Sequence, residues 1–309
     1  MKGHTPLHLL PEATPLANLF FPVERDAVLL ISLPRGGSSW IGSVLGSASN
    51  AAYLREPITQ SYMRDHAPCA SFFDPAACRD PIAYRSWSSN AFRGIPSFDQ
   101  RIIIDPGQWR LLQRRRRHIV IKEVNPLCLE QLIADFSPRV IYLLRHPAAV
   151  AASFAALGWS GDQFSARFTA SHLSRLSRRF DIDTSAGPWK QLGALQAITQ
   201  NLSNDALRGH DKALVVRYED ICVEPMERFR TLFNFADLNW DRTIEERIGS
   251  SASSLAGDYT PGRYDLERDS RSMATRWKQL VSEAQLQEVR EGYFANHPLF
   301  YKDDADWVL

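Results

Sequence analysis

Short, continuously apolar segments recur along the chain, separated by stretches of helical length and pattern. They cover residues 27–33, 118–124, 139–144 and 213–217. Strands whose apolar residues run on without alternation are buried on both faces, and alternation of strands with helices favours right-handed crossovers. The pattern therefore predicts an α/β fold with a parallel sheet flanked by helices.

Three segments lie outside this alternation. Residues 1–26, with four prolines, form an expected irregular arm, and residues 27–309 form one expected domain, because no repeat or Ser/Gly linker divides them. Residues 60–117 are rich in aromatics, Pro and Ser, and residues 239–276 in Ser, Asp and Arg. Long irregular segments beyond the carboxyl ends of parallel strands usually build a lid or pocket, so we expect both to cover a substrate.

The composition excludes several classes of protein. Of the 309 residues, 44% are hydrophobic and 23% are charged, which is typical of a globular protein with a large core. The formal net charge of +1 gives no strong overall field of the kind expected for a general binder of nucleic acid or anionic membranes. We therefore expect neither partner, and an anionic ligand must be bound locally.

The spacing of the cysteines and the hydropathy of the chain indicate whether it binds a metal and in which cellular compartment it is expected. The four cysteines show no C-x-x-C pair or metal-ligand spacing, which argues against a zinc site and a disulfide framework. The N-terminus lacks a signal-peptide pattern, and no stretch approaches the roughly 18 apolar residues of a membrane span. We expect a cytoplasmic protein without a metal, and the sequence leaves its oligomeric state open.

The end of the first apolar run offers a candidate anion site. Residues 34–40 read Pro-Arg-Gly-Gly-Ser-Ser-Trp, and the residues that follow suit a helix. Free N–H groups and the positive dipole end at such a junction attract an anion. The glycines allow positive φ, the serines add donors and the arginine adds charge. The alternative is a tight turn with a capping serine. The candidate residues are Arg35, Gly36, Gly37, Ser38 and Ser39.

A second candidate anion site lies about 110 residues downstream. Arg145 follows the apolar run 139–144, and Pro147 suits the first turn of the next helix. The small side chains of the alanines between positions 148 and 152 leave room beside that helix, so that an anion can approach both Arg145 and Ser153. The alternative is an arginine paired with a carboxylate beside an alanine-rich helix.

These two sites resemble those of a known family. The G-x-x-x-x-G-K-[ST] spacing of ATP and GTP enzymes is absent, which disfavours an ordinary kinase. Residues 34–40 instead resemble the 5′-phosphosulfate loop of sulfotransferases that use 3′-phosphoadenosine 5′-phosphosulfate (PAPS). The family holds the 3′-phosphate with an arginine at a strand end and a serine eight residues later, as from Arg145 to Ser153. His146 departs from the usual Asp or Asn, which puts a local salt bridge there in doubt.

Further matches extend the resemblance, so that all the matches together run from about residue 27 to 295. The family clamps the 3′-phosphate with a basic segment before a Trp-Lys pair, which resembles the stretch before Trp277 and makes Arg271 and Ser272 candidates, with Arg268 in reserve. A solvated loop of salt-bridged arginines is the alternative. Resemblance also implies that Trp40 stacks on adenine, whereas core packing is the alternative. Residues 217–220 resemble an R-Y-E-D segment, in which we interpret the tyrosine and both acidic residues as structural.

Sulfuryl transfer needs a base and positive groups around the leaving oxygen, but no metal. Glycan and protein-tyrosine members carry a glutamate where this chain has Glu56, so the resemblance makes Glu56 the base. Pro57 is expected to hold it in extended geometry at a strand end. Arg35 and Lys122 are expected to stabilise the leaving phosphate and the sulfuryl or bridge oxygens. The alternatives are an arginine partner for Glu56 and an ion pair between Lys122 and a neighbour such as Glu123.

The rival base is a histidine, which cytosolic members of the family use. His172 lies among phenylalanines and a leucine at four-residue intervals, which predicts a position on an apolar helix stripe. A histidine in such a place is more often packed in a core than reactive. His66 and His118 are less constrained still. The stripe consists of Phe164, Phe168, His172, Leu176 and Phe180.

These observations predict a PAPS-dependent sulfotransferase with one P-loop-type α/β domain and 3′-phosphoadenosine 5′-phosphate (PAP) as product. The expected acceptor is a hydroxyl of a carbohydrate or of a small natural product, which rests on the resemblance alone. Two alternatives remain at this point. One is a nucleotide-dependent phosphotransferase on the same architecture, and the other is a catalytically silent protein that binds an adenosine phosphate.

Overall fold

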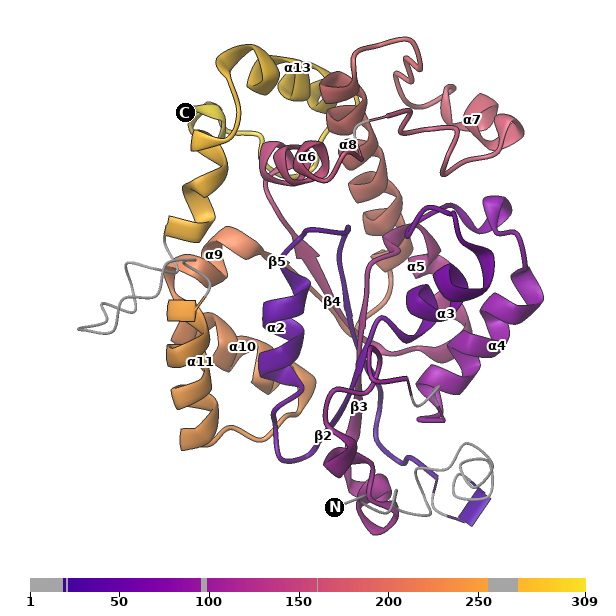
Figure 1. Cartoon of the computed structure of the whole chain (residues 1–309), viewed down its shortest axis with the longest axis vertical. Coiled ribbons are helices and arrows are strands. Elements are labelled where there is room, and N and C mark those ends of the chain that lie inside the picture. Colours follow the sequence, from indigo (N-terminus) through magenta and orange to yellow (C-terminus); the bar gives the residue numbers. More distant parts are fainter. Residues whose placement is uncertain (1–18, 21, 96–98, 160, 255–271) are drawn as a thin grey trace.

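Parallel strands in one sheet run through the centre of the molecule (Figure 1). The structure, a computed structural model, describes residues 19–20, 22–95, 99–159, 161–254 and 272–309. Within these ranges the sheet has five strands in the order β2-β3-β1-β4-β5, and each neighbouring pair is parallel. The strands are β1 (Val28–Ile31), β2 (Ala51–Arg55), β3 (His118–Glu123), β4 (Arg139–Leu144) and β5 (Ala213–Arg217). The predicted α/β fold is confirmed.

The expected burial on both faces holds for four of the five strands. Every residue of β1 and β3 is buried, and β2 and β4 have one half-buried residue each. β5 is mostly half-buried because it pairs only with β4, at the edge of the sheet. β1 is shorter than the apolar run that predicted it. The chain turns away after Ser32, where the Gly36 N–H donates to the Leu33 carbonyl at 3.0 Å.

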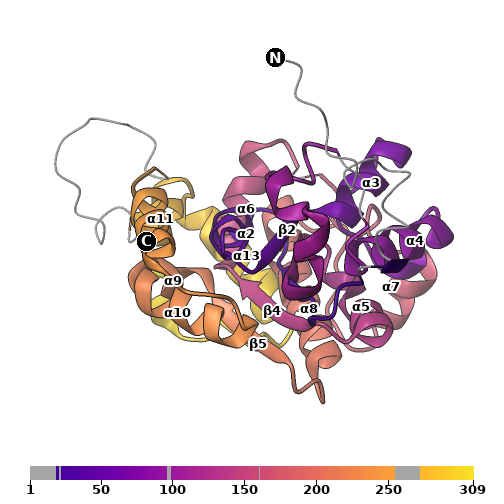
Figure 2. The same cartoon turned by 90° about the horizontal axis from the view of Figure 1, so that it is seen from below.

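Helices cover both faces of the sheet. Val28 and Leu30 of β1 point into one apolar cluster, and Leu29 and Ile31 into the other. Figure 2 shows α9, α10 and α11 on one side and α4 and α5 on the other. The first cluster is closed by α2 (Ser38–Leu45), α9 (Tyr218–Val223), α10 (Pro225–Ala236) and α11 (Arg242–Ser254). The second is closed by α3 (Pro57–His66), α4 (Pro81–Phe92), α5 (Leu129–Phe136), α6 (Pro147–Ala156), α7 (Ala170–Leu176), α8 (Pro188–Leu207) and α13 (Glu283–Phe294).

The segment 60–117 differs from the irregular structure expected for it. It contains most of α3, all of α4 and three short 3-10 helices. The start of α4 carries two sequence signals that the aromatic-rich composition obscured. The Asp80 side chain caps the helix by accepting a hydrogen bond from the Ala83 N–H at 2.9 Å, and Pro81 occupies the first turn. Residues 239–276 contain α11, and positions 255–271 lie outside the described residues. That both segments cover a substrate stays a prediction.

The parallel order brings chemistry to one edge of the sheet. Arg35, Glu56 and Arg145 follow the carboxyl ends of β1, β2 and β4, and Lys122 is the last residue but one of β3. Because parallel strands end at the same edge, these four side chains are gathered there although they are scattered along the sequence. Among the helices of the described ranges, none is both long enough and apolar enough to cross a bilayer.

Candidate active site

The loop after β1 forms an uncapped helix N-terminus. Gly37 is the N-cap of α2, with a φ of 90°, and as a glycine it makes no side-chain capping hydrogen bond. A Cβ at Gly37 would lie 2.3 Å from the Tyr218 ring, so a glycine is required there for both φ and space. Of the two glycines that allow a positive φ, Gly37 adopts one, and the other positive φ of this loop, 67°, belongs to Arg35. The free N–H groups suit an anion.

The serines of this loop differ in exposure. Ser38 is buried, with its hydroxyl 2.9 Å from that of Ser32, whereas Ser39 is exposed. Arg35 is exposed as well, at the mouth of the loop. The loop therefore presents one serine and one guanidinium to solvent, on a floor of backbone N–H groups.

The two predicted anion sites lie side by side. Arg35 donates from Nε to the Ser153 hydroxyl on α6 at 2.7 Å, and Arg145 donates from Nη1 to the Arg35 carbonyl at 2.8 Å. The Arg145 guanidinium also lies over the Tyr218 ring, 4.7 Å from its centroid. Tyr218, interpreted from the sequence as structural, thus touches both loops. Sequence reasoning did not place its ring between Gly37 and Arg145.

These two arginines have unused capacity for an anion. Within the part of the chain that the structure describes, neither Arg35 nor Arg145 forms an ion pair with a carboxylate. The Arg145 Nε is buried and has no hydrogen-bond partner. A buried donor without a partner is costly, and a bound phosphate oxygen would satisfy it. The two arginines therefore suit a ligand that carries anionic groups.

His146 stands where the family usually has Asp or Asn, and its neutral imidazole caps the N-terminus of α6. Its Nδ1 accepts from the Ala148 N–H at 3.2 Å at the start of α6. Burial, followed by the nearby positive charge of Arg217, lowers the pKa of His146 to about 3. The imidazole stacks on Trp277, with centroids 4.3 Å apart and planes at 7°. A local salt bridge at this position is therefore replaced by an uncharged cap.

The C-terminal residues pack behind the same corner. Glu219 accepts from the His146 N–H at 2.9 Å and from the Tyr301 hydroxyl at 2.7 Å. Arg217 pairs with Asp306 at 2.7 Å, in the short helix η7 (Asp304–Trp307). Burial raises the pKa of Glu219, although these hydrogen bonds oppose the rise. The end of the chain thus supports the backbone that carries Arg145.

All the predicted nucleotide-binding residues stay predictions, and three of them are not among the residues whose contacts are described above. The ring of Trp40 is buried, edge-on to Tyr218 and Phe229, as the core-packing alternative has it. Ser272 is exposed, and Arg271 lies outside the described residues, as does the reserve candidate Arg268.

Glu56 and Lys122 form an ion pair at the ends of β2 and β3. The lysine side chain is 2% exposed, and the carboxylate also accepts from Gln60 Nε2 at 3.0 Å. Burial by itself would raise the pKa of Glu56, but the Lys122 ammonium outweighs it, so the pKa lies below the usual value. Lys122 therefore pairs with Glu56, and not with Glu123 as the alternative had it.

The backbone of Glu56 corrects one prediction. Instead of the extended geometry expected before Pro57, Glu56 is left-handed, with φ 52° and ψ 46°. Its N–H donates to the Lys122 carbonyl at 2.6 Å, while its own carbonyl accepts from the Gln60 N–H at 2.8 Å. These two bonds turn the chain directly from β2 into α3, and together they outweigh the local preference of a residue before proline.

Glu123 is a buried carboxylate that sequence reasoning considered only as a partner of Lys122. Its Oε1 accepts from the Ile58 N–H at 2.7 Å and its Oε2 from the Thr59 hydroxyl at 2.6 Å, in the first turn of α3. Burial and the charge of Glu56 raise the pKa of Glu123 to about 7, against these hydrogen bonds. An acidic residue at the end of a mainly apolar strand was the signal available in the sequence. Its position fixes the turn that carries Glu56.

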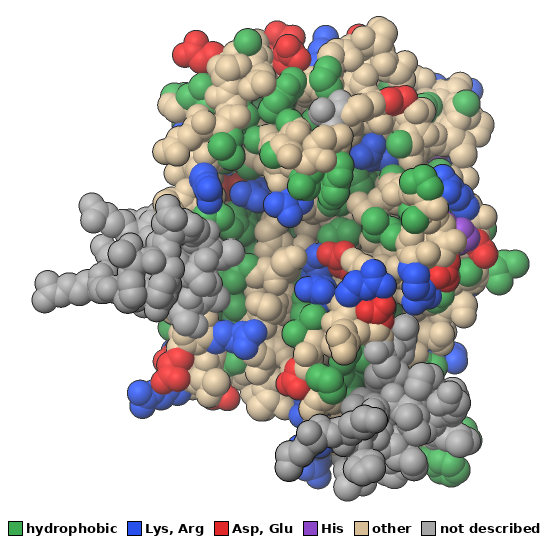
Figure 3. Space-filling model, viewed as in Figure 1, with side chains coloured by type: hydrophobic (Ala, Val, Ile, Leu, Met, Phe, Trp, Pro, Cys, Tyr) green, Lys and Arg blue, Asp and Glu red, His purple; other side chains and the backbone are tan. Residues whose placement is uncertain are grey.

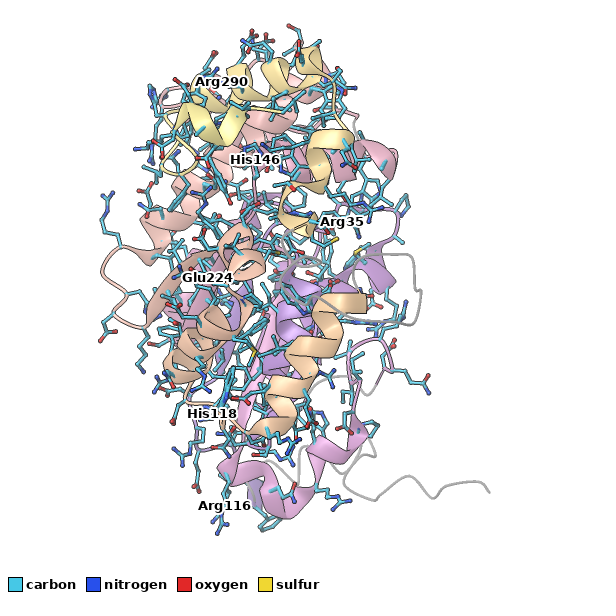
Figure 4. All side chains as sticks on the ribbon, turned by 90° about the vertical axis from the view of Figure 1, so that its left-hand side faces the viewer. Arg35, Arg116, His118, His146, Glu224 and Arg290 are labelled. Atoms are coloured by element: carbon cyan, nitrogen blue, oxygen red, sulfur yellow. The ribbon has the colours of Figure 1, made fainter. Side chains whose placement is uncertain are left out.

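The histidines lie apart from this edge or have partners. His172 Nδ1 lies 2.6 Å from Asp74 Oδ1, and α7 spans only 170–176, so Phe164 and Phe168 are buried outside the helix that their spacing predicted. His118 lies at the start of β3, at the opposite end of the strand from the site. Figure 4 shows Arg35 and His146 near one another, with His118 well separated from both.

Comparison with known proteins gives the family. A sequence model of the sulfotransferase family matches residues 27–242. The chain belongs to the sulfotransferase family. It is 21% identical over 321 residues to carbohydrate sulfotransferase 1 of Danio rerio, covering 84% of this chain and 73% of that protein. The predicted enzyme class is therefore confirmed.

Solved sulfotransferase structures resemble this one. The sulfotransferase domain from the curacin biosynthetic pathway has 16% identity and a TM-score of 0.48, covering 86% of this chain and 96% of that chain. Mouse sulfotransferase SULT7A1 complexed with PAP has 14% identity and a TM-score of 0.47, covering 98% and 92%.

Proposed function

We propose that this sulfotransferase uses PAPS as its donor, and that the two joined anion sites hold the two ends of that nucleotide. The contact between Arg35 and Ser153, with Arg145 beside them, carries the proposal. PAPS has a phosphosulfate on one side of its ribose and a phosphate on the other. The loop from Arg35 to Ser39 would hold the phosphosulfate, and Arg145 with Ser153 the 3′-phosphate.

The acid–base part of the reaction falls to Glu56. Its lowered pKa keeps the carboxylate deprotonated at neutral pH, ready to accept the proton of an acceptor hydroxyl. The acceptor oxygen forms a bond to sulfur as the bond from sulfur to the 5′-phosphate oxygen breaks, and PAP leaves. Lys122, held against Glu56, and Arg35, on the loop, are positioned to stabilise the charge that moves onto the departing oxygen.

The acceptor that we propose is a hydroxyl of a carbohydrate. The matched relative is named as a carbohydrate sulfotransferase, which supports this choice. A small natural product with a hydroxyl is the second candidate.

Thermal shift and sulfate transfer test this function. PAP should raise the melting temperature in the absence of magnesium, whereas a phosphotransferase should respond to Mg-ATP. With labelled PAPS and a panel of acceptors, wild type should transfer sulfate and Glu56→Gln should lose about 10²- to 10⁴-fold in rate, the usual contribution of a general base. Equal rates would remove Glu56 from its role. PAP binding without any transfer would instead indicate a silent nucleotide-binding protein.

A further inference from the structure

The carboxylate that caps α3 comes from another part of the chain. Glu56 occupies the N-cap position of that helix, where a polar side chain usually accepts a hydrogen bond from the second or third helical N–H group, but its carboxylate makes no such bond. The N–H groups of Ile58 and Thr59 donate instead to Oε1 of Glu123, at 2.7 and 3.3 Å. Pro57, the first helical residue, has no N–H. Glu123 on β3 therefore acts as the N-cap of a helix to which it does not belong.

The capping carboxylate is buried and well supplied with donors. Glu123 is 2% exposed, and its second oxygen, Oε2, accepts from the Thr59 hydroxyl at 2.6 Å. A buried carboxylate is costly unless donors surround it, and here three donors in the first turn of α3 do so. The positive end of the helix dipole favours a negative charge at the same place. These contacts explain why an acidic side chain is stable inside the protein at this point.

The neighbouring residue of β3 holds Glu56 itself. The Lys122 carbonyl accepts from the Glu56 N–H at 2.6 Å, and the Lys122 ammonium pairs with the Glu56 carboxylate. The left-handed backbone of Glu56, which costs a residue with a side chain roughly 1–2 kcal/mol, is thereby maintained. An N-cap residue is usually extended, and so is a residue before proline. Glu56 therefore has a competing conformation, in which it would be extended and would cap α3 with its own carboxylate.

The two carboxylates differ in their access to a substrate. The side chain of Glu56 is 19% exposed, whereas Glu123 as a whole residue is 2% exposed. On the face drawn in Figure 3, Lys and Arg side chains flank the hollow at the middle of the molecule, at the level where the strands end. The helix is thus capped by the carboxylate that is closed to solvent, and the accessible one stays beside Lys122.

We propose that Glu123 is a positioning residue, which keeps Glu56 available for catalysis by capping α3 in its place. The inference rests on the proposed function for the role of Glu56 as base, but the exchange between the two carboxylates does not depend on that role. Without the Glu123 carboxylate, the N–H groups of Ile58 and Thr59 lose their acceptor, and an unsatisfied buried donor is costly. Glu56 then turns to the extended backbone, accepts from these groups and leaves Lys122.

Crystal structures with PAP bound, together with sulfate transfer from labelled PAPS to the best acceptor of the panel above, test this proposal. In Glu123→Ala we expect the Glu56 carboxylate to accept from the first turn of α3 and to leave Lys122. The kcat should fall about 100-fold, as for a misplaced reacting group, while calorimetric titration shows little change in PAP affinity. Glu123→Asp, whose carboxylate falls short of the two N–H groups, gives the same test in a less disruptive form.

Two further variants separate positioning from general stability. Glu123→Gln keeps an oxygen for the two N–H groups, and its amide can donate to the Thr59 hydroxyl, which accepts as well as donates. It should therefore leave Glu56 on Lys122 and retain most of the wild-type kcat. Asp80→Ala is the matched control, because it removes another carboxylate cap, from the start of α4. It should lower the melting temperature without moving Glu56 or changing kcat.

The outcomes distinguish this inference from the proposed function. If Glu56 remains on Lys122 in both Glu123→Ala and Glu123→Asp, the inference is overturned, even where Glu56→Gln abolishes transfer and so upholds the proposed function. Equal losses of kcat in Glu123→Ala and Asp80→Ala overturn it as well, because they indicate a loss of stability alone. Movement of Glu56 onto the α3 N–H groups when the acceptor is lost, but not in Glu123→Gln, supports it even if no sulfate transfer is found.

Discussion

Arg35 donates a hydrogen bond of 2.7 Å to the hydroxyl of Ser153, although 118 residues separate them in the sequence. The sequence around either residue does not by itself predict that the two side chains are in contact. Their contact joins the loop after β1 to the helix after β4, which are adjacent strands in the sheet. The pair therefore shows how close the two predicted anion sites lie to one another.

Loss of the Arg145 charge should weaken nucleotide binding. We expect Arg145→Gln to reduce PAP affinity by about 10- to 100-fold, because a hydrogen bond to a charged group contributes roughly 1.5–3 kcal/mol. Calorimetric titration with PAP measures this. Arg208→Gln is the control, since that arginine is exposed and pairs with Asp205 far along the chain from the site. Equal affinities for Arg145→Gln and wild type would remove Arg145 from the nucleotide site.

Removal of Lys122 should move the pH dependence of transfer. The ammonium lowers the pKa of Glu56, so Lys122→Met should raise that pKa and shift the acid limb of kcat/KM to higher pH. The profile of kcat/KM between pH 5 and 9 measures the shift. A lower rate with the acid limb unmoved would contradict the assignment of that limb to Glu56.

Glu123 should make stability depend on pH in a defined direction. Its folded-state pKa of about 7 lies above the usual carboxyl value of 4.5, so its contribution is fully present below pH 4.5 and is lost as the pH rises through 7. Glu123→Gln removes this dependence. We therefore expect the stability of Glu123→Gln relative to wild type to rise between pH 5 and pH 8, by up to about 3 kcal/mol. Urea unfolding at both pH values measures it, and a constant difference would contradict it.

Substitution of Gly37 should separate backbone strain from steric clash. Gly37→Ala meets both a positive φ and the Tyr218 ring at 2.3 Å, whereas Gly158→Ala meets a φ of 70° with no atom within 4 Å. A positive φ costs an alanine roughly 1–2 kcal/mol. We expect that loss of stability for Gly158→Ala, and a larger loss together with weaker PAP binding for Gly37→Ala. Equal losses in thermal unfolding would show that the ring moves aside freely.

His146 should remain uncharged throughout the neutral range. With its pKa near 3, its ring resonances should not titrate between pH 5 and pH 8 in NMR spectra. His146→Asn keeps a side-chain acceptor for the Ala148 N–H, and His146→Ala does not. The alanine variant should therefore be less stable than the asparagine variant by about 1 kcal/mol, the usual value of a helix cap. A ring that titrates near pH 6.5 would contradict the neutral cap.

Local patterns predicted the framework well. The bounds of β4 and β5 follow from apolar runs that polar residues end sharply, and α2 follows from the serines after Gly37. The carboxyl-edge position of Arg145 follows from strand order, once a parallel sheet is accepted. These features depend on residues close together in the chain, which is why the sequence suffices for them.

Long-range partners were harder to predict. Lys122 had a carboxylate next to it in sequence, yet it pairs with Glu56, because alternate residues of a strand face opposite sides of the sheet. The left-handed backbone of Glu56 likewise depends on a hydrogen bond to the neighbouring strand. Glu123 gains its role from α3, which the composition of its segment did not predict. Each of these depends on which elements become neighbours in space.

Tyr301 and Trp277 contact Glu219 and His146, which lie far from them in the sequence. The C-terminal residues therefore support a part of the structure that is distant along the chain. A version of this enzyme cut short after Phe294 would retain Glu56, Lys122 and Arg145, yet would lose the Tyr301 and Trp307 side chains that pack against His146, next to Arg145. We therefore expect fusion tags and deletions at that terminus to disturb the backbone that carries Arg145.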